Sequence, residues 1–167
     1  MIRYLKIILA AFVGLQGFFY FGENIANWQE AKGFVAYVFS MTGHEAYPNT
    51  LLPPITSPAL VTAALAVIVA GEFLVGAISF IGVFNMLRAA NAPGPAFEAS
   101  KTFAILGCGM ALIVWFGLFT VIGGALFGMW QTQLGDASLD GSLQYVLTSG
   151  LVMLFIAMKD DQAPLTR

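Results

Sequence analysis

Glu72 is the residue whose type and position most strongly suggest chemistry in this chain. It is the only charged residue in the apolar stretch from Pro58 to Leu87. An ionised carboxylate is costly in hydrocarbon, so such an acid is expected to be protonated or hydrogen-bonded inside a helix bundle. Two interpretations follow: a carboxyl that accepts protons or binds an ion or partner, or a neutral acid that joins two helices by one hydrogen bond worth about 0.6 kcal/mol. The candidate hydrogen-bond partners are water and the side chains of Gln16, Ser79 and Thr120.

The residues that most enzymes need are scarce. His44 is the only histidine and Cys108 the only cysteine, which excludes a bis-histidine haem, a histidine-rich metal cluster and a thiolate cluster within the chain. The sequence has no Gly-rich phosphate-binding motif and no Ser-His-Asp arrangement. We interpret His44 and Glu45 as surface residues and Cys108 as a small packing residue. The sequence therefore predicts no catalytic residue, no metal and no cofactor.

The composition predicts a membrane protein. The 167 residues are 59% hydrophobic and 10% charged, with a mean hydropathy of +0.83. A bilayer core of roughly 30 Å needs about 20 apolar residues per helix. Four stretches approach or exceed this length, at about residues 4–22, 58–87, 101–130 and 143–158. We predict an all-α membrane protein, a four-transmembrane-helix bundle that forms a single membrane domain over residues 1–167.

The connecting segments predict how the bundle is oriented. Residues 23–57 form a long first loop, in which Phe34, Val35, Val38 and Phe39 share one helical face and predict an amphipathic segment. Lys32 is the only lysine or arginine on that side of the four-span arrangement. The positive-inside rule then places both termini and loop 88–100 in the cytoplasm, and loops 23–57 and 131–142 outside. The basic residues on the cytoplasmic side are Arg3, Lys6, Arg88, Lys101, Lys159 and Arg167.

The third span carries small residues and ends in an aromatic–polar pair. Glycines let helix backbones approach closely, which favours packing in lipid, either within the chain or between subunits. The predicted packing residues are Gly117, Gly123, Gly124 and Gly128. Trp28, Trp130 and Gln131 are predicted to anchor the bundle at the membrane interface, with a ligand or quinone pocket beside Trp130 as the alternative. Gln16, the one strongly polar residue of the first span, is predicted to lie inside the membrane.

Three features of the sequence resemble an uncharacterised family of predicted small bacterial integral membrane proteins. They are ITSPAL at Ile55–Leu60, Glu72 in the second span, and VIGGALFGMWQTQ at Val121–Gln133. The third span of that family typically has W-F-x-x-F-x-V-I-G-G-E-W-F-x-M-W-Q-S. This chain matches that pattern from Trp115 to Gln131, except that Ala125 and Leu126 replace the Glu-Trp pair. It also differs before the second span, where Pro53-Pro54 replaces a Trp-Arg pair that is common in the family. The resemblance spans nearly the whole chain and implies four spans, a bacterial inner membrane and no established reaction.

These features together predict a non-enzymatic protein of the bacterial inner (plasma) membrane. We expect an accessory or scaffold subunit that packs against a larger membrane complex of the respiratory or photosynthetic type, or against copies of itself. Membrane lipids are the other expected partners. A nucleic-acid partner is not expected, because the net charge is -2 and the basic residues are dispersed. The alternative is a small proton-coupled transporter, or a lipid- or quinone-binding membrane protein, that uses Glu72.

Overall fold

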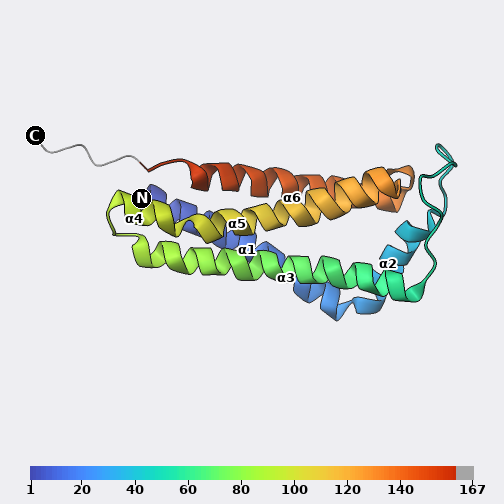
Figure 1. The fold of residues 1–167 in the computed structure, drawn as a ribbon, viewed down its shortest axis with the longest axis horizontal. Coiled ribbons are helices and arrows are strands. Elements are labelled where there is room, and N and C mark those ends of the chain that lie inside the picture. Colours follow the sequence, from blue (N-terminus) through green and yellow to red (C-terminus); the bar gives the residue numbers. More distant parts are fainter. Residues whose placement is uncertain (161–167) are drawn as a thin grey trace, which may run out of the picture.

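The computed structural model describes residues 1–160 of the chain. Every regular element in this range is a helix (Figure 1), which confirms the predicted all-α class. In chain order the elements are α1 (Ile2–Ala26), α2 (Trp28–Ser40), α3 (Pro58–Ala89), α4 (Gly94–Ser100), α5 (Thr102–Leu112), η1 (Ile113–Leu126), η2 (Met129–Gln131) and α6 (Gln133–Ala157).

Four helical segments are long and apolar enough to cross a membrane. They are α1, α3, the continuous segment Gly94–Leu126 that contains α4, α5 and η1, and α6. These segments run lengthwise beside one another in Figure 1. We call one end of the bundle the termini end, because the start of α1 and the end of α6 lie there beside α4, and the other end the α2 end. The predicted four-helix membrane bundle is confirmed.

Two helices begin earlier than the sequence predicts. α6 begins at Gln133, so most of the predicted external loop 131–142 is helical. Thr132 caps this helix, because its hydroxyl accepts a hydrogen bond from the backbone amide of Gly135 at 3.2 Å. The third helical segment begins at Gly94, inside the predicted loop 88–100. The first turns of both helices are rich in small and polar residues. This composition is typical of loops, although these residues are helical here.

The first span is broken where α1 meets α2. α1 continues to Ala26, beyond the predicted limit at residue 22, and Asn27 then adopts φ -113° and ψ 42°. α2 follows and packs Val35 against Val61 and Leu65 of α3. The amphipathic segment predicted in the first loop is therefore a helix that covers the first turns of α3.

Glycines bring α3 close to both α1 and α5. A Cβ atom on Gly17 of α1 would lie 2.7 Å from the backbone of α3 at Glu72 and Gly76. Gly82 of α3 lies so close to the backbone of Ala104 in α5 that no side chain fits between them. Close backbone approach of this kind is a main source of helix affinity in lipid. α3, the helix that carries Glu72, is thus held tightly on two sides.

The second half of the third span is a π-helix. It extends over the fourteen residues of η1, and the bond from the Phe127 amide to the Ile122 carbonyl at 3.0 Å closes its last turn. π-helical segments are rare, are usually a single turn long, and often occur at functional sites. Gly128, the second residue after η1, has a φ of 62°, in the left-handed region that favours glycine.

Candidate functional site

Glu72 lies inside the bundle, and Asn24 is its hydrogen-bond partner. Glu72 is 1% exposed. The side-chain amide of Asn24 donates to both carboxylate oxygens, at 2.9 and 2.8 Å. Asn24 lies in the last turn of α1, next to the break at Asn27. The pair therefore joins α1 to α3 at the point where the first span is interrupted.

None of the three side chains predicted as partners forms a hydrogen bond with Glu72. Gln16 Nε2 and Ser79 Oγ are buried and have no hydrogen-bond partner among the described residues. The Thr120 hydroxyl donates to the Trp115 carbonyl of its own helix at 3.4 Å. Gln16 lines a groove of about 350 Å³ between α1 and α6. Glu72 and Gln16, the two predicted intramembrane polar residues, therefore belong to different helix contacts.

An aromatic cluster lies one helical turn from Asn24. It consists of Tyr20 from α1, Trp115 from η1 and Tyr145 from α6, with ring centroids 5.1 to 5.8 Å apart. The hydroxyl groups of Tyr20 and Tyr145 form a hydrogen bond with each other. This cluster connects α6 to the other spans at the level next to the Glu72–Asn24 pair.

The four glycines predicted to pack the third span have different surroundings. A Cβ on Gly124 would lie 3.2 Å from the Leu139 side chain of α6, so Gly124 packs against that helix. Gly123 faces the side chain of Met129, in the turn that follows η1. A Cβ on Gly117 would meet no other helix within 4 Å among the described residues, so the packing predicted for it is not made within residues 1–160. Gly128 lies beyond the helix, where its left-handed backbone, and not helix packing, requires glycine.

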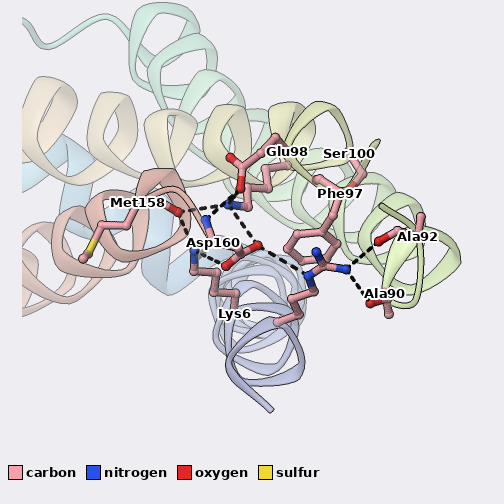
Figure 2. A network of polar contacts seen from close by, with 10 residues as sticks. Lys6, Ala90, Ala92, Phe97, Glu98, Ser100, Met158 and Asp160 are labelled. Carbon is pink, nitrogen blue, oxygen red and sulfur yellow. Dashed lines mark hydrogen bonds and ion pairs between the residues drawn. The ribbon is translucent and has the colours of Figure 1, made fainter. Parts of the chain in front are cut away.

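A network of charged residues closes the termini end (Figure 2). Lys6 of α1 and Lys101, between α4 and α5, are only 1% and 2% exposed. The Lys6 ammonium donates to Asp160 at 2.9 Å, and the Lys101 ammonium donates to Glu98 at 2.6 Å. Both lysines also donate to the backbone carbonyl of Met158. The network therefore fixes the segment after α6 against α1 and α4.

Arg3 extends this network to the connection between α3 and α4. Its guanidinium donates to the carbonyls of Ala90 and Ala92 at 3.0 and 2.7 Å (Figure 2). The guanidinium carbon also lies 4.6 Å from the ring centre of Phe97, which is fully buried. Because Arg3 contacts both backbone and ring, it holds the α3–α4 connection against the start of α1.

Asp160 is the carboxylate on which the charged side chains converge. Burial raises the pKa of Asp160, but the hydrogen bond from Lys6 and the charges of Lys101 and Lys6 outweigh it and hold the pKa below its usual value. Asp160 is therefore ionised at neutral pH and paired with the two buried lysines.

An apolar cavity of about 200 Å³ lies between α2, α3 and η1. Val67 and Ile122, two of its lining residues, are 57% and 40% exposed, so the cavity opens onto the outer surface of the spans. The lining contains no polar side chain and consists of Phe34, Val35, Val38, Phe39, Ala64, Val67, Ile68, Leu118, Phe119, Ile122, Gly123 and Met129. Glu72 and Gln16 are not part of it. We refer to this site as the apolar cavity.

A second cavity, of about 170 Å³, lies at the α2 end between the loop after α2 and the turn at Gly128. We refer to it as the polar cavity. Its polar lining residues are Tyr47, Asn49, Thr50, Trp130 and Gln131. The backbone amide of Tyr47 donates to Gln131 Oε1 at 2.7 Å, and the rings of Tyr47 and Trp130 meet edge to face at 5.4 Å.

The residues predicted as interface anchors do not lie together. Trp130 and Gln131 share the polar cavity. Trp28 opens α2 and packs, partly buried, against the cluster formed by Val35 and the first turns of α3. The structure thus assigns Trp130 and Gln131, but not Trp28, to one local site.

Sequence reasoning missed Asn24, the pairing of Lys6 with Asp160, and the apolar cavity. A pocket beside Trp130 was predicted only as the alternative to interface anchoring, and the polar cavity lies at that residue. Asn24 follows Gln16 and Tyr20 at intervals of four residues, which is the helical spacing that places side chains on one face. That spacing would have identified Asn24 had the first span been extended beyond residue 22. Lys6 gave a comparable signal, because it is a lysine inside an apolar span.

The comparisons with known proteins give a family but no characterised relative. No curated protein and no solved structure matches the chain. Residues 2–159 match the family described as "Predicted small integral membrane protein (DUF2165)". The four apolar helices of the structure agree with that description. The chain therefore belongs to the DUF2165 family of predicted small integral membrane proteins.

Proposed function

We propose that this protein is a non-enzymatic membrane protein that binds a single apolar chain, the acyl or isoprenoid chain of a membrane lipid, in the apolar cavity. The observation that carries the proposal is the lining of that cavity, in which every side chain is apolar. A site with such a lining offers a ligand no hydrogen bond and no charge. Because lipid chains already lie in hydrocarbon, the affinity would come from van der Waals packing of the ligand against the lining and not from removal of apolar surface from water.

The size and the opening of the cavity suit a chain ligand. An apolar cavity of about 150 Å³ is large enough to bind benzene, so the volume of about 200 Å³ accepts a comparable or slightly larger length of hydrocarbon. The exposed rim residues Val67 and Ile122 belong to two spans, α3 and η1. A chain in the surrounding bilayer could therefore enter between them without crossing water.

A photochemical experiment tests this proposal. The purified chain, in nanodiscs, is incubated with a diacylglycerol that carries a diazirine on one acyl chain, and labelled peptides are identified after irradiation. Ala64→Phe fills the cavity from α3, whereas Ala66→Phe makes the same change on an exposed face of the same helix. We expect label on α2, α3 and η1 residues of the cavity in the wild type and in Ala66→Phe, and its loss in Ala64→Phe. Equal labelling of the two variants would overturn the proposal.

The accessory-subunit function is a second candidate, and α6 is the observation that favours it. α6 buries the smallest share of its apolar stretch, 17%, against 28% to 39% for the other spans. Its leucines 143, 147, 151 and 154 recur at helical spacing and are 51% to 67% exposed. Such a row provides one long face for another transmembrane helix, from a larger complex or from a second copy of the chain.

Native gels of mildly solubilised membranes test this second candidate. A lipid-facing position tolerates a bulkier apolar side chain, whereas a packed helix contact does not. Leu147→Trp on α6 should therefore dissociate a larger assembly, and Leu106→Trp, at an equally exposed site on α5, should leave it intact. Migration of the wild type as a single chain would remove this candidate.

We further propose that the termini end faces the cytoplasm of a bacterial inner membrane. Arg3, Lys6 and Lys101 meet at that end (Figure 2), and Arg88 lies in the last turn of α3 beside it. Lys32 belongs to α2. This distribution supports the orientation through the positive-inside rule. Arg167, which the sequence analysis also placed on the cytoplasmic side, lies outside the described residues. Cysteine labelling of Ser57→Cys in intact cells, from the outside only, tests the orientation.

A further inference from the structure

We infer that the polar cavity binds the headgroup of the same lipid, and that this headgroup is uncharged and hydroxylated, such as glycerol or a sugar. This inference rests on the proposed function, because it takes the apolar cavity as the site of the lipid chain. It adds the chemical class of the ligand, which the apolar cavity alone does not define.

The polar cavity is lined by neutral groups that can form hydrogen bonds. Asn49 contributes an amide and Thr50 a hydroxyl, whose proton is donated to the Leu52 carbonyl at 2.7 Å, so that its oxygen remains an acceptor. Gln131 uses its carbonyl oxygen to accept from the Tyr47 backbone, which leaves its amide hydrogens as donors. Trp130 is 41% exposed and adds an aromatic surface. Amides, a hydroxyl and an aromatic ring together suit a ligand with several hydroxyl groups.

The charge of the lining argues against a phosphate headgroup. None of the residues that line the polar cavity is a lysine, an arginine, an aspartate or a glutamate. A phosphate would be desolvated there without the cationic partner that normally binds it. A hydroxylated neutral group loses far less solvation energy on entry, and it can exchange its water contacts for those of Asn49 and Gln131.

The two cavities are neighbours along η1, in the order that a lipid requires. Leu118, Phe119, Ile122 and Gly123 of η1 line the apolar cavity. Residues 125–128, at the end of η1 and in the turn after it, line the polar cavity further toward the α2 end. Phe39 of the apolar cavity stacks on Phe127 of the polar cavity, with ring centroids 4.4 Å apart. A lipid with its headgroup at the end of the bundle and its chain directed inward would therefore pass this pair of rings.

The turn at Gly128 gives the polar cavity its shape. A Cβ on Gly128 would lie 2.9 Å from Gln131 Nε2 and 3.3 Å from His44 Cε1, so these two side chains close around the turn. His44 Nδ1 is buried and has no hydrogen-bond partner among the described residues. An unpaired buried nitrogen beside the cavity is a further group that a ligand hydroxyl would satisfy.

Native mass spectrometry with lipids of identical chains tests the inference. The delipidated full-length protein is titrated with dioleoylglycerol, monoglucosyl-dioleoylglycerol and dioleoylphosphatidylglycerol, and in a separate arm with free glucose. We expect the two neutral lipids to bind about tenfold more tightly than phosphatidylglycerol, and free glucose to compete poorly. Equal affinity for all three lipids, preference for phosphatidylglycerol, or competition by glucose as strong as by the glycolipid would overturn the inference.

Matched variants separate the failure of this inference from the failure of the proposed function. Asn49→Leu should abolish the headgroup preference and keep chain binding, whereas Asn91→Leu, on the exposed connection between α3 and α4, should change neither. Ala64→Phe should weaken all three lipids equally. Thr50→Val provides a second headgroup variant if Asn49→Leu does not fold. Chain binding without headgroup preference refutes only the inference, and absence of any lipid binding refutes the proposed function.

Discussion

The amide of Asn24 donates to both carboxylate oxygens of Glu72 across the contact between α1 and α3. This pair provides the acid with a partner inside the bundle, although no lysine or arginine within residues 1–160 hydrogen-bonds to it. It also places the polar contact beside the break at Asn27, where the chain leaves α1. The first span and α3 are therefore joined by a polar contact at the point where helical packing of the first span ends.

Asn24→Leu is expected to destabilise the bundle, because it leaves two buried oxygens of Glu72 without a donor. An unsatisfied buried polar group costs about 1–3 kcal/mol. The measurement is the free energy of unfolding in mixed detergent micelles, followed by circular dichroism. Asn91→Leu, at an exposed position, is the control. If the two variants had the same free energy of unfolding, the Asn24–Glu72 pair would not contribute to the stability of the bundle.

Glu72→Gln should preserve both stability and lipid binding. A neutral amide of the same shape can still accept from Asn24, and a single hydrogen bond between membrane helices contributes only about 0.6 kcal/mol. Glu72 also lies outside the apolar cavity. Chain labelling should therefore match the wild type. Loss of labelling in a folded Glu72→Gln protein would favour the alternative in which lipid binding uses Glu72. Loss of a proton-coupled transport activity in that variant would favour the transporter interpretation.

Acid should weaken the termini end through Asp160. Because the pKa of Asp160 is lower in the folded protein than its usual value, its ionised form contributes stability above that usual value, about 3.9. This contribution is lost as the pH falls further, through the folded pKa. Asp160→Asn should be less stable than the wild type at neutral pH and should lose less stability on acidification. Asp140→Asn removes an exposed carboxylate of α6 and should retain the acid sensitivity of the wild type. Parallel acid curves for all three proteins would contradict the role of Asp160.

The contact between α3 and α5 should be intolerant of any side chain at Gly82. Gly82→Ala places a methyl group against the backbone of Ala104, and backbone cannot move aside as a flexible side chain can. We expect a loss of about 1–3 kcal/mol in unfolding free energy, the usual cost of overpacking. Gly109→Ala on α5 is the matched control, since a Cβ there meets no other element among the described residues. Comparable stability of the two variants would show that the helices separate readily.

The number of spans could be predicted from the sequence because it depends only on the length of the apolar stretches. The first turns of α6 were mistaken for a loop, because Asp136 and Asp140 lie on an exposed helical face and their polarity does not distinguish helix from loop. Asn24 was missed because the first span was predicted to end at residue 22, whereas α1 continues to Ala26.

The apolar cavity was beyond sequence reasoning for a different reason. The apolar cavity exists only because α2 folds back over Ala64 and Ile68 of α3 and faces Phe119 of η1. Each of these residues is typical of a packed core or a lipid-facing surface. Their arrangement around a space depends on the break at Asn27 and on the π-helical geometry of η1, and neither has a clear sequence signature.

The most direct test of the central claim is the lipid that the protein retains from its own membrane. Wild type, Ala64→Phe and Ala66→Phe are purified in the same mild detergent, their fold is checked by circular dichroism, and the extracted lipids and isoprenoids are quantified by mass spectrometry. We predict a near-stoichiometric apolar-chain molecule in the wild type and in Ala66→Phe, and its loss from Ala64→Phe. Equal retention by the two folded variants, or no retained molecule in the wild type, would contradict the account.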